Sequence, residues 1–521
     1  MIGFHRKSGS LLLQADDPLA IRDLLPHSKL IDYKGYNVAV QHTLASTKVL
    51  QNIGFDPPAP IRFKYNWPGK YKPFDHQIEM AEFLTVNRRC FNLSEMGTMK
   101  TASALWAADW LMLTGRVKKC VIFAPLSTLK TVWQADLFDV LLHRTCSIVH
   151  GPREKRERAL DADVDFYIIN HEALTIPWLY KRLMSDPRFN LMILDEGSMF
   201  RNARTQKWKL LYRILKLQSR YRFWLATGTP CPQEPTDSWA LTRLVNPSRV
   251  PDFFGSYQRL LMVKTSPFKW DARPGAYRLA YEAMQPAIRF LKKDCIDLPP
   301  VVTQDRSCTL SPKQLSMFKS MKAMMVAEAR GQQINAVNAA DKIGKLRQIL
   351  CGAIKHPKTG EYITVEHSSR FDVMMEAIQG ASGKIIVVAP FKGIIKPLAA
   401  AMIAHGVSVG ILNGDVTPKE RNKTIHEFKT QKDPHALLCH PKVMAHGLNL
   451  TEADTLIFYA PIYSNDEYRQ VIERFNRQGQ KRKMTIVRIG AHPIEWAIYR
   501  VVDSRGVTQD NILKLYKSVI T

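Results

Sequence analysis

The segment Asn92-Leu-Ser-Glu-Met-Gly-Thr-Met-Lys-Thr101 decides which fold we expect, because it has the features of a phosphate-binding loop. It follows an apolar stretch and opens a predicted helix, so loop amides and the helix N-terminus would face an anion. Lys100 would supply a point charge, and the Thr101 hydroxyl would bind Mg²⁺. Because Met99 stands where such loops usually have glycine, the segment alone fits a plain lysine near a helix start equally well. The predicted nucleotide contacts here are Met96, Gly97, Thr98, Met99, Lys100 and Thr101.

Two adjacent carboxylates, Asp195 and Glu196, follow the apolar run 191–194 further along the chain. Acidic groups at the carboxyl end of a buried strand are typical of a ligand site in an open α/β sheet. Asp195 would hold Mg²⁺, directly or through water, and Glu196 would orient and deprotonate the attacking water. An isolated Asp-Glu pair is usually a turn or a helix N-cap, but its combination with Lys100 and Thr101 favours a nucleotide site.

Upstream of the loop, the string Phe74-Asp75-His76-Gln77 leads a predicted helix over 77–84. The Gln77 amide can pair with N6 and N7 of adenine, and the Phe74 ring can cover the base. Helix capping by Asp75 explains part of the same string, so this segment alone supports either interpretation.

Short apolar runs alternate with helical stretches on both sides of residue 300, which predicts doubly wound parallel sheets. The expected strands are 121–124, 166–169, 191–194 and 223–226, then 385–388, 407–412, 436–439, 456–459 and 485–489. Between the two sets, strand signals fade and 312–330 and 335–351 look helical. Residues 36–40 alternate in a turn-rich N-terminal stretch. We therefore expect an accessory domain over 1–69, lobes over 70–247 and 381–521, and an insertion over 248–380.

The charge balance predicts a polyanionic partner. The chain has 74 Lys and Arg against 47 Asp and Glu, a formal net charge of +27. Such an excess favours nucleic acid, because each phosphate contact releases counterions. No apolar run reaches the ~18 residues of a membrane span, and the eight cysteines contain no C-x-x-C pair that would indicate zinc. We expect a cytoplasmic, nucleoid-associated protein with no membrane partner.

The order of the motifs resembles the Snf2-like branch of the superfamily 2 helicases. Besides the segments above, the resemblance covers 124–127, 225–230, 237–247, 297–300 and 345–349 in the first part and 447–453 and 470–480 in the second. It implies an α/β fold with two RecA-like doubly wound lobes, a mostly helical insertion and a small N-terminal accessory domain. Met99 and Ser198 depart from the family pattern, in which glycine and histidine stand at these places.

The resemblance also implies that ATP and Mg²⁺ bind between the lobes. Arg474 and Arg477 would act as arginine fingers, because a permanently charged guanidinium neutralises charge that develops on the transferred phosphoryl group. Gln470 would share a helix face with them and contact the nucleotide, although a surface salt-bridge array fits the same spacing. The residues expected to hold DNA phosphates are Pro125, Ser127, Thr128, Asn170, His171, Asn413, Gly414, Gly447 and Asn449.

As a function, we expect an ATP-driven translocase on duplex or branched DNA, without sequence preference. It would remodel DNA by branch migration, fork reversal or annealing during replication, recombination or repair in a bacterium or phage-infected cell, as a monomer by default. Replication or recombination proteins would be its partners. Three alternatives stay open: a strand-separating DNA or RNA helicase, a DNA-binding protein whose ATP site has decayed, and the translocating subunit of a restriction enzyme.

Overall fold

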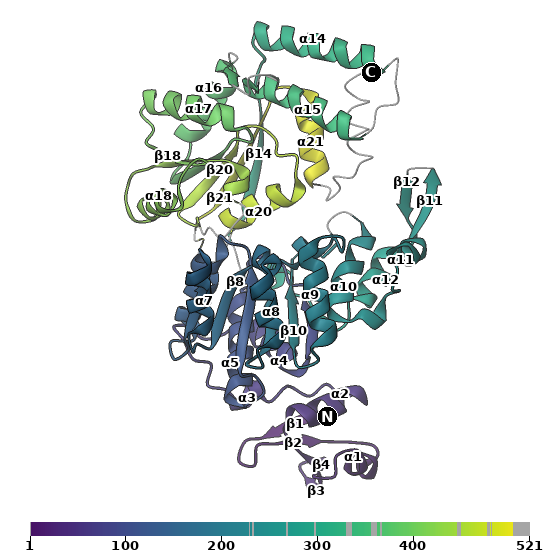
Figure 1. Cartoon of the computed structure of the whole chain (residues 1–521). Helices are drawn as coiled ribbons and strands as arrows, with labels where there is room; N and C mark the ends of the chain where they lie inside the picture. Colours follow the sequence, from purple (N-terminus) through teal and green to yellow (C-terminus); the bar gives the residue numbers. More distant parts are fainter. Residues whose placement is uncertain are drawn as a thin grey trace. The chain divides into compact units, whose positions relative to one another are not determined.

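The computed structural model describes residues 2–228, 230–231, 234–266, 269–295, 299–329, 336–355, 362–364, 367–444, 450–476, 480 and 482–503. The chain divides into two compact units, Met1–Cys295 and Ile296–Thr521 (Figure 1). Three of the predicted site residues, Arg477, Gly447 and Asn449, lie outside the described residues. The boundaries predicted for the four domains stay predictions.

The N-terminal residues form a small antiparallel sheet in the order β1-β2-β4-β3. Its strands are β1 (Ile2–His5), β2 (Ser10–Leu13), β3 (Lys29–Tyr33) and β4 (Tyr36–Gln41), and helices α1 (Pro18–Leu24) and α2 (Leu44–Asn52) accompany them. Val38 and Val40 are buried on β4 and pack with Leu11 and Leu13 of β2. The alternation predicted at 36–40 therefore marks a strand with one buried face.

The first lobe is a seven-stranded sheet with the order β13-β5-β10-β9-β6-β8-β7, and all of its pairs are parallel. The strands are β5 (Arg89–Asn92), β6 (Lys119–Ala124), β7 (Cys146–Val149), β8 (Phe166–Asn170), β9 (Phe189–Leu194), β10 (Arg222–Ala226) and β13 (Ala287–Ile288). Its helices are α3 (Ile61–Lys64), α4 (Asp75–Val86), α5 (Lys100–Leu113), α6 (Ala135–Val140), α7 (Arg153–Asp161), α8 (Pro177–Ser185), α9 (Gln206–Leu217) and α10 (Ser238–Val245). All four strands predicted for this lobe are confirmed.

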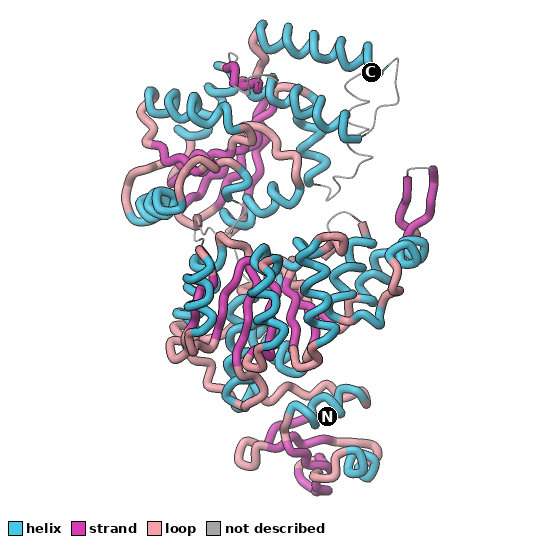
Figure 2. Tube along the Cα trace, in the orientation of Figure 1, coloured by secondary structure: helices cyan, strands magenta, loops and turns pink. Residues whose placement is uncertain are grey.

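Helices cover both faces of this sheet (Figures 1 and 2). Along β6, Cys120 and Ile122 belong to one hydrophobic core, whereas Val121 and Phe123 belong to the other. Strands buried on both faces read as continuous apolar runs, which is why the sequence predicted them.

The second lobe repeats this plan with six parallel strands in the order β14-β21-β20-β17-β19-β18. The strands are β14 (Val301–Ser307), β17 (Lys384–Val388), β18 (Val409–Leu412), β19 (Ala436–Cys439), β20 (Ala453–Phe458) and β21 (Met484–Gly490). Its helices are α14 (Pro312–Ala329), α15 (Ala336–Cys351), α16 (Ser368–Gln379), α17 (Lys392–Ala404), α18 (Pro418–Thr430), α19 (Pro441–Met444), α20 (Asn465–Phe475) and α21 (Pro493–Asp503).

The stretch predicted as a helical insertion is helical in part, but it also supplies an edge strand to each large sheet. Strand β13 pairs with β5, and strand β14 pairs with β21. Two hairpins lie in it as well, β11 (Met262–Ser266) with β12 (Lys269–Ala272) and β15 (Ala353–Lys355) with β16 (Tyr362–Thr364). Helices α11 (Phe254–Leu261), α12 (Ala276–Ala283) and α13 (Lys292–Cys295) lie in it, as do α14, α15 and α16 of the second lobe. Within the described residues, no helix is long and apolar enough to cross a membrane.

Candidate nucleotide site and its surroundings

The predicted phosphate loop connects β5 to α5, and Lys100 is the first residue of that helix. The Lys100 ammonium donates to the carbonyl oxygens of Ser94 (2.6 Å) and Glu95 (3.0 Å). The Thr98 hydroxyl also donates to Glu95 O, at 2.8 Å. The loop therefore curls around the lysine, and the helix N-terminus and the ammonium lie together, as an anion site requires.

Met99 holds the backbone conformation that glycine would adopt without strain. Its φ of 56° lies in the left-handed region, which costs an L-residue with a Cβ roughly 1–2 kcal/mol. Gly97, two residues earlier, has a φ of 85°. The departure from the family pattern at Met99 therefore leaves the path of the loop intact and adds local strain.

The segment 287–292, which begins with β13, runs beside the loop, although the sequence did not associate it with the site. After pairing with β5, it accepts a hydrogen bond from Glu95 N at Phe290 O (3.0 Å), and Lys292 N donates to Glu95 Oε2 (3.0 Å). Lys292 is only 7% exposed. Its Cε lies 3.3 Å from the place that a Cβ on Gly97 would occupy. A second lysine therefore lies against the phosphate loop, and no local sequence pattern predicted it.

The two carboxylates follow the end of β9, and the backbone of Glu196 is strained. Asp195 Oδ1 accepts from Glu196 N at 2.9 Å, and Asp195 Oδ2 accepts from the indole Nε1 of Trp133 at 2.9 Å. Glu196 has a φ of 49°, a conformation that persists in non-glycine residues where the surroundings enforce it, often at active sites. A Cβ on Gly197 would lie 2.3 Å from Leu225 Cδ2, so a larger residue there would displace the Leu225 side chain.

The expected adenine contact has a buried donor with no partner. Gln77 is 0% exposed, and its Oε1 accepts from Phe74 N at 3.0 Å. Gln77 Nε2 has no hydrogen-bond partner, although buried amide donors normally have one. Phe74 is 44% exposed and stacks on His76, with ring centroids 5.7 Å apart. Gln77 caps the helix through its Oε1, and Asp75 does not cap it. The unpartnered Gln77 Nε2 suits an acceptor nitrogen of adenine, and the exposed Phe74 ring suits a position over the base.

His76 connects this corner to the phosphate loop, because its Nε2 donates to Thr98 O at 3.3 Å. In the sheet, β10 lies between β5 and β9, so the loop and the two carboxylates follow two parallel strands that are one strand apart, at the carboxyl end of the sheet. The donor set also suits Mg²⁺, which is usually held by one or two carboxylates together with phosphates and waters. Among the described residues, no group of three or more His, Cys, Asp or Glu side chains could hold a metal ion. Mg²⁺ at this site would therefore also need phosphate and water ligands.

Two of the predicted DNA-contact segments lie at this same edge, after β6 and β8. Thr128 is buried, and its hydroxyl donates to Pro125 O at 2.9 Å. His171 is 2% exposed, and its Nε2 donates to Asp195 O at 2.9 Å. Burial lowers the pKa of His171 to about 4, so the ring is neutral at pH 7. Its side chain supports Asp195 from within the lobe, and Asn170 precedes it at the strand end.

In the second lobe, Asn413 and Gly414 follow β18. Asn413 is 4% exposed, and its Oδ1 accepts from Asp415 N at 3.0 Å. Gly414 is exposed, and Lys392 pairs with Asp415 at 3.1 Å beside it. Gln470 and Arg474 are partly buried on α20, and their spacing of four residues places them on one helix face.

Comparison with known proteins identifies the family. Residues 76–358 match the SNF2-related domain, and residues 369–479 match the helicase conserved C-terminal domain. The chain belongs to the SNF2-related family. The SNF2-related match covers more than half of the chain and confirms the resemblance on which the motif assignments rest.

Several curated relatives resemble this SNF2-related chain at modest identity. An ATP-dependent helicase of Mycoplasma pneumoniae is 25% identical over 407 residues, covering 76% of this chain and 37% of the relative. TATA-binding protein-associated factor 172 of Homo sapiens is 25% identical over 394 residues, covering 63% and 20%. Protein p41 of Acyrthosiphon pisum secondary endosymbiont phage 1 is 24% identical over 468 residues, covering 86% and 98%. The chain thus spans about a third of the Mycoplasma relative and nearly all of the phage protein.

Among solved structures, the SWI2/SNF2 ATPase core of Sulfolobus solfataricus in complex with double-stranded DNA is 20% identical. The alignment covers 87% of this chain and 95% of that chain, with a TM-score of 0.41.

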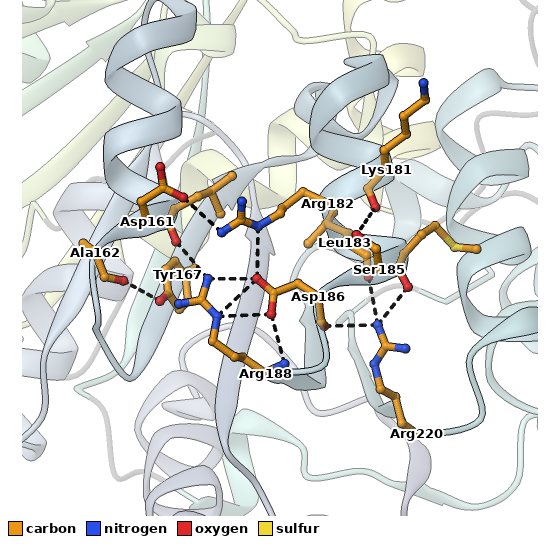
Figure 3. Close-up of polar contacts among 12 residues, drawn as sticks. Asp161, Ala162, Tyr167, Lys181, Arg182, Leu183, Ser185, Asp186, Arg188 and Arg220 are labelled. Carbon is orange, nitrogen blue, oxygen red and sulfur yellow. Dashed lines mark hydrogen bonds and ion pairs between the residues drawn. The ribbon is translucent and has the colours of Figure 1, made fainter.

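A second polar cluster in the SNF2-related lobe lies near the start of β9, at the opposite end of that strand from Asp195 (Figure 3). The Asp186 carboxylate accepts from the guanidinium groups of Arg182 (3.0 Å) and Arg188 (2.8 Å). Although burial opposes ionisation, these bonds lower the pKa of Asp186 to about 2. Arg220 donates to the carbonyl oxygens of Met184 and Asp186. This cluster fixes the turn between α8 and β9 and is a structural feature.

Proposed function

We propose that the chain is an ATP-driven motor that moves along duplex or branched DNA. One observation carries this proposal: the Lys100 loop and the Asp195-Glu196 pair follow strands β5 and β9, which flank β10 in one parallel sheet. Ligands of open α/β sheets bind at the carboxyl ends of the strands. The unpartnered Gln77 Nε2 supports adenine as the base.

Each residue has a role in this mechanism. Lys100 and Thr101 hold the phosphates, and Gln77 holds the base. Thr101 and Asp195 would hold Mg²⁺, which neutralises charge on the phosphoryl oxygens when it is bound. Glu196 accepts a proton from the attacking water. Arg474 and Arg477 of the second lobe would act as arginine fingers, so that hydrolysis would depend on lobe movement.

DNA as the track is supported by the net charge of +27 and by membership of the family. Pro125, Ser127, Asn170 and Gly414, with the further predicted residues Gly447 and Asn449, would line its path. The buried Thr128, His171 and Asn413 would hold these segments in place from within each lobe. Binding through backbone phosphates would be indifferent to sequence and steeply salt-dependent. Because a phage protein matches over nearly its whole length, we place the activity in replication, recombination or repair, in the cytoplasm at the nucleoid, with proteins of those processes as partners.

A strand-separating helicase is the second candidate, since the helicase C-terminal domain is present. A decayed ATP site is less well supported, because Met99 keeps the left-handed conformation of the loop. Translocation without strand separation is therefore the function we favour.

The test compares ATP hydrolysis without DNA and with single-stranded, duplex, forked and four-way-junction DNA. We expect duplex or branched DNA to stimulate hydrolysis, and Glu196→Gln to lower the stimulated rate by about 10²-fold or more. Glu154→Gln on the exposed helix α7 is the matched control and should keep the rate.

Displacement of a triplex-forming strand, measured beside duplex unwinding, separates the candidates. Displacement without unwinding supports a translocase, and unwinding supports the strand-separating helicase. If the wild-type protein shows no DNA-stimulated hydrolysis, or Glu196→Gln leaves it unchanged, the motor is excluded.

A further inference from the structure

The turn between β6 and α6 has an uncommon backbone. Residues Leu129–Gln134 form a π-helical turn, and such turns are rare and concentrate at functional sites. Leu129 and Trp133 are buried on it, whereas Lys130 and Thr131 are exposed. The turn directly follows the predicted DNA-contact residues Pro125–Thr128. One of its faces is therefore available to a polyanion, while the other is packed into the lobe.

The buried face reaches the nucleotide site through one hydrogen bond. Trp133 is 2% exposed, and its indole Nε1 donates to Asp195 Oδ2 at 2.9 Å. Indole nitrogen is a donor only, so this bond holds one carboxylate oxygen in a fixed direction. Since Glu196 N holds the other oxygen at 2.9 Å, the carboxylate has a defined orientation.

Other buried indoles of the same core have different acceptors. Trp224 is also 2% exposed and belongs to the same hydrophobic cluster as Trp133, but its Nε1 donates to the backbone carbonyl of Asn87 at 3.1 Å. Trp106 likewise donates to Pro68 O at 2.9 Å. Burial of the ring alone therefore does not explain why the Trp133 donor is directed at Asp195.

We propose that Trp133 is a positioning residue through which DNA held on the turn sets the orientation of the Asp195 carboxylate. This inference rests on the proposed function and adds the route by which DNA stimulates hydrolysis. A π-helical turn carries one more residue per hydrogen-bonded ring than an α-helix. Tightening of the turn against a phosphate would rotate Trp133 about the helix axis and move its N–H relative to Asp195.

The experiment compares Trp133→Phe with Trp224→Phe. Both variants keep an aromatic ring in the same core and remove one indole donor. Thermal unfolding of each shows that it is folded and gives the loss from packing. The readouts are the KM for ATP, the ratio of kcat with saturating duplex DNA to kcat without it, and the Kd for the duplex in the absence of nucleotide.

We expect Trp133→Phe to lower the stimulation ratio by about tenfold or more, as for outer partners of catalytic carboxylates. Its KM and DNA Kd should stay close to the wild-type values, and Trp224→Phe should keep the wild-type ratio. A third variant, Trp133→His, retains a ring N–H in a smaller ring and should recover part of the ratio.

The outcomes separate this inference from the proposed function. Wild-type protein without DNA stimulation would refute the motor itself. Normal stimulation in Trp133→Phe, beside a stimulated wild type, would refute the role of Trp133 alone. Equal losses in Trp133→Phe and Trp224→Phe, or in Trp133→Phe and Trp133→His, would assign the effect to packing and would also refute it.

Discussion

The two lobes share one architecture but differ in where their unusual conformations and charges lie. Both are parallel sheets covered on two faces. The non-glycine residues with positive φ are Lys34, Trp67, Met99 and Glu196 among those described, so all belong to Met1–Cys295 and two lie at the candidate site. The second lobe instead encloses an ion pair between Arg370 and Glu495, which are 2% and 1% exposed.

This difference indicates that the two lobes have different roles. Backbone strain at Met99 and Glu196 marks loops that the surrounding structure holds in place, as it does at many functional sites. The Arg370 guanidinium donates to Glu495 at 2.6 Å and to Tyr459 O at 2.6 Å. Its charge therefore joins α16 to α21 and to the residue that follows β20. We infer that the first lobe binds the nucleotide, whereas the second is a packed frame that carries Arg474 on α20.

The largest expected effect separates the two contributions directly. Arg474→Ala should lower kcat by about 10³-fold or more, because an arginine finger acts on charge that develops in the transition state. The Kd for ATP should change little. Lys100→Ala should instead weaken ATP binding itself. Stopped-flow binding and steady-state hydrolysis distinguish the two variants, with Arg469→Ala on the same helix α20 as control. Loss of binding in Arg474→Ala would contradict the division of roles.

The second effect concerns the frame. Arg370→Met should destabilise the second unit by about 3–5 kcal/mol, because Glu495 would be left buried and charged without its partner. The double variant Arg370→Met with Glu495→Met should recover much of that loss. Urea unfolding measures both, and ATP binding should persist in the double variant. A single variant as stable as wild type would show that the pair contributes nothing to the frame.

The sequence predicted the central strands other than β5 because both of their faces are buried. The runs 191–194 and 385–388 are continuously apolar, and both form strands. Two of the edge strands, β13 and β14, escaped prediction for the opposite reason, whereas the edge strand β18 was predicted. Strand β14 is mostly exposed and carries polar residues, and β13 contains only the two residues Ala287 and Ile288. Strand β14 therefore lacks the apolar run on which prediction depends, and β13 is too short to contain one.

At the site, the sequence predicted the residues that belong to local motifs, and the structure places Lys100 and Asp195 at one sheet edge. It did not predict Trp133, which lies 62 residues from its acceptor Asp195, or Lys292, which lies 197 residues from Glu95. Such contacts arise only when the sheet brings distant segments together. The family pattern identified Met99 as a departure, but only the backbone shows that the loop keeps its path.

A third, smaller effect tests how the stability of the first lobe depends on pH through His171, whose ring donates to Asp195 O. Burial lowers the pKa of His171 from 6.5 to about 4, so the unfolded chain takes up a proton before the folded lobe does. The stabilising effect is complete above pH 6.5 and falls as the pH decreases towards 4. Between pH 6.5 and 5 this amounts to about 2 kcal/mol.

His171→Gln, which can still donate to Asp195 O, should flatten the pH dependence of the unfolding free energy by that amount. His42, whose pKa burial also lowers to about 4, contributes a similar slope that the variant retains. The exposed His27→Gln is the control and should change nothing. An unaltered slope in His171→Gln would mean that the ring is accessible to protons in the folded lobe.

The smallest effect measures the strain in the phosphate loop. Met99→Gly should raise the free energy of unfolding of the first unit by about 1 kcal/mol, because glycine adopts φ near 56° without a Cβ clash. Part of that gain is lost to the greater freedom of glycine in the unfolded chain. Gly115→Ala is the matched control, since Gly115 has a φ of 69° with no heavy atom within 4 Å of a Cβ. It should lose about as much stability as Met99→Gly gains. If Met99→Gly does not raise the free energy of unfolding while Gly115→Ala lowers it, contacts of the Met99 side chain offset the strain of its backbone. In the candidate site, the contrast in backbone strain between the lobes would then rest on Glu196 alone.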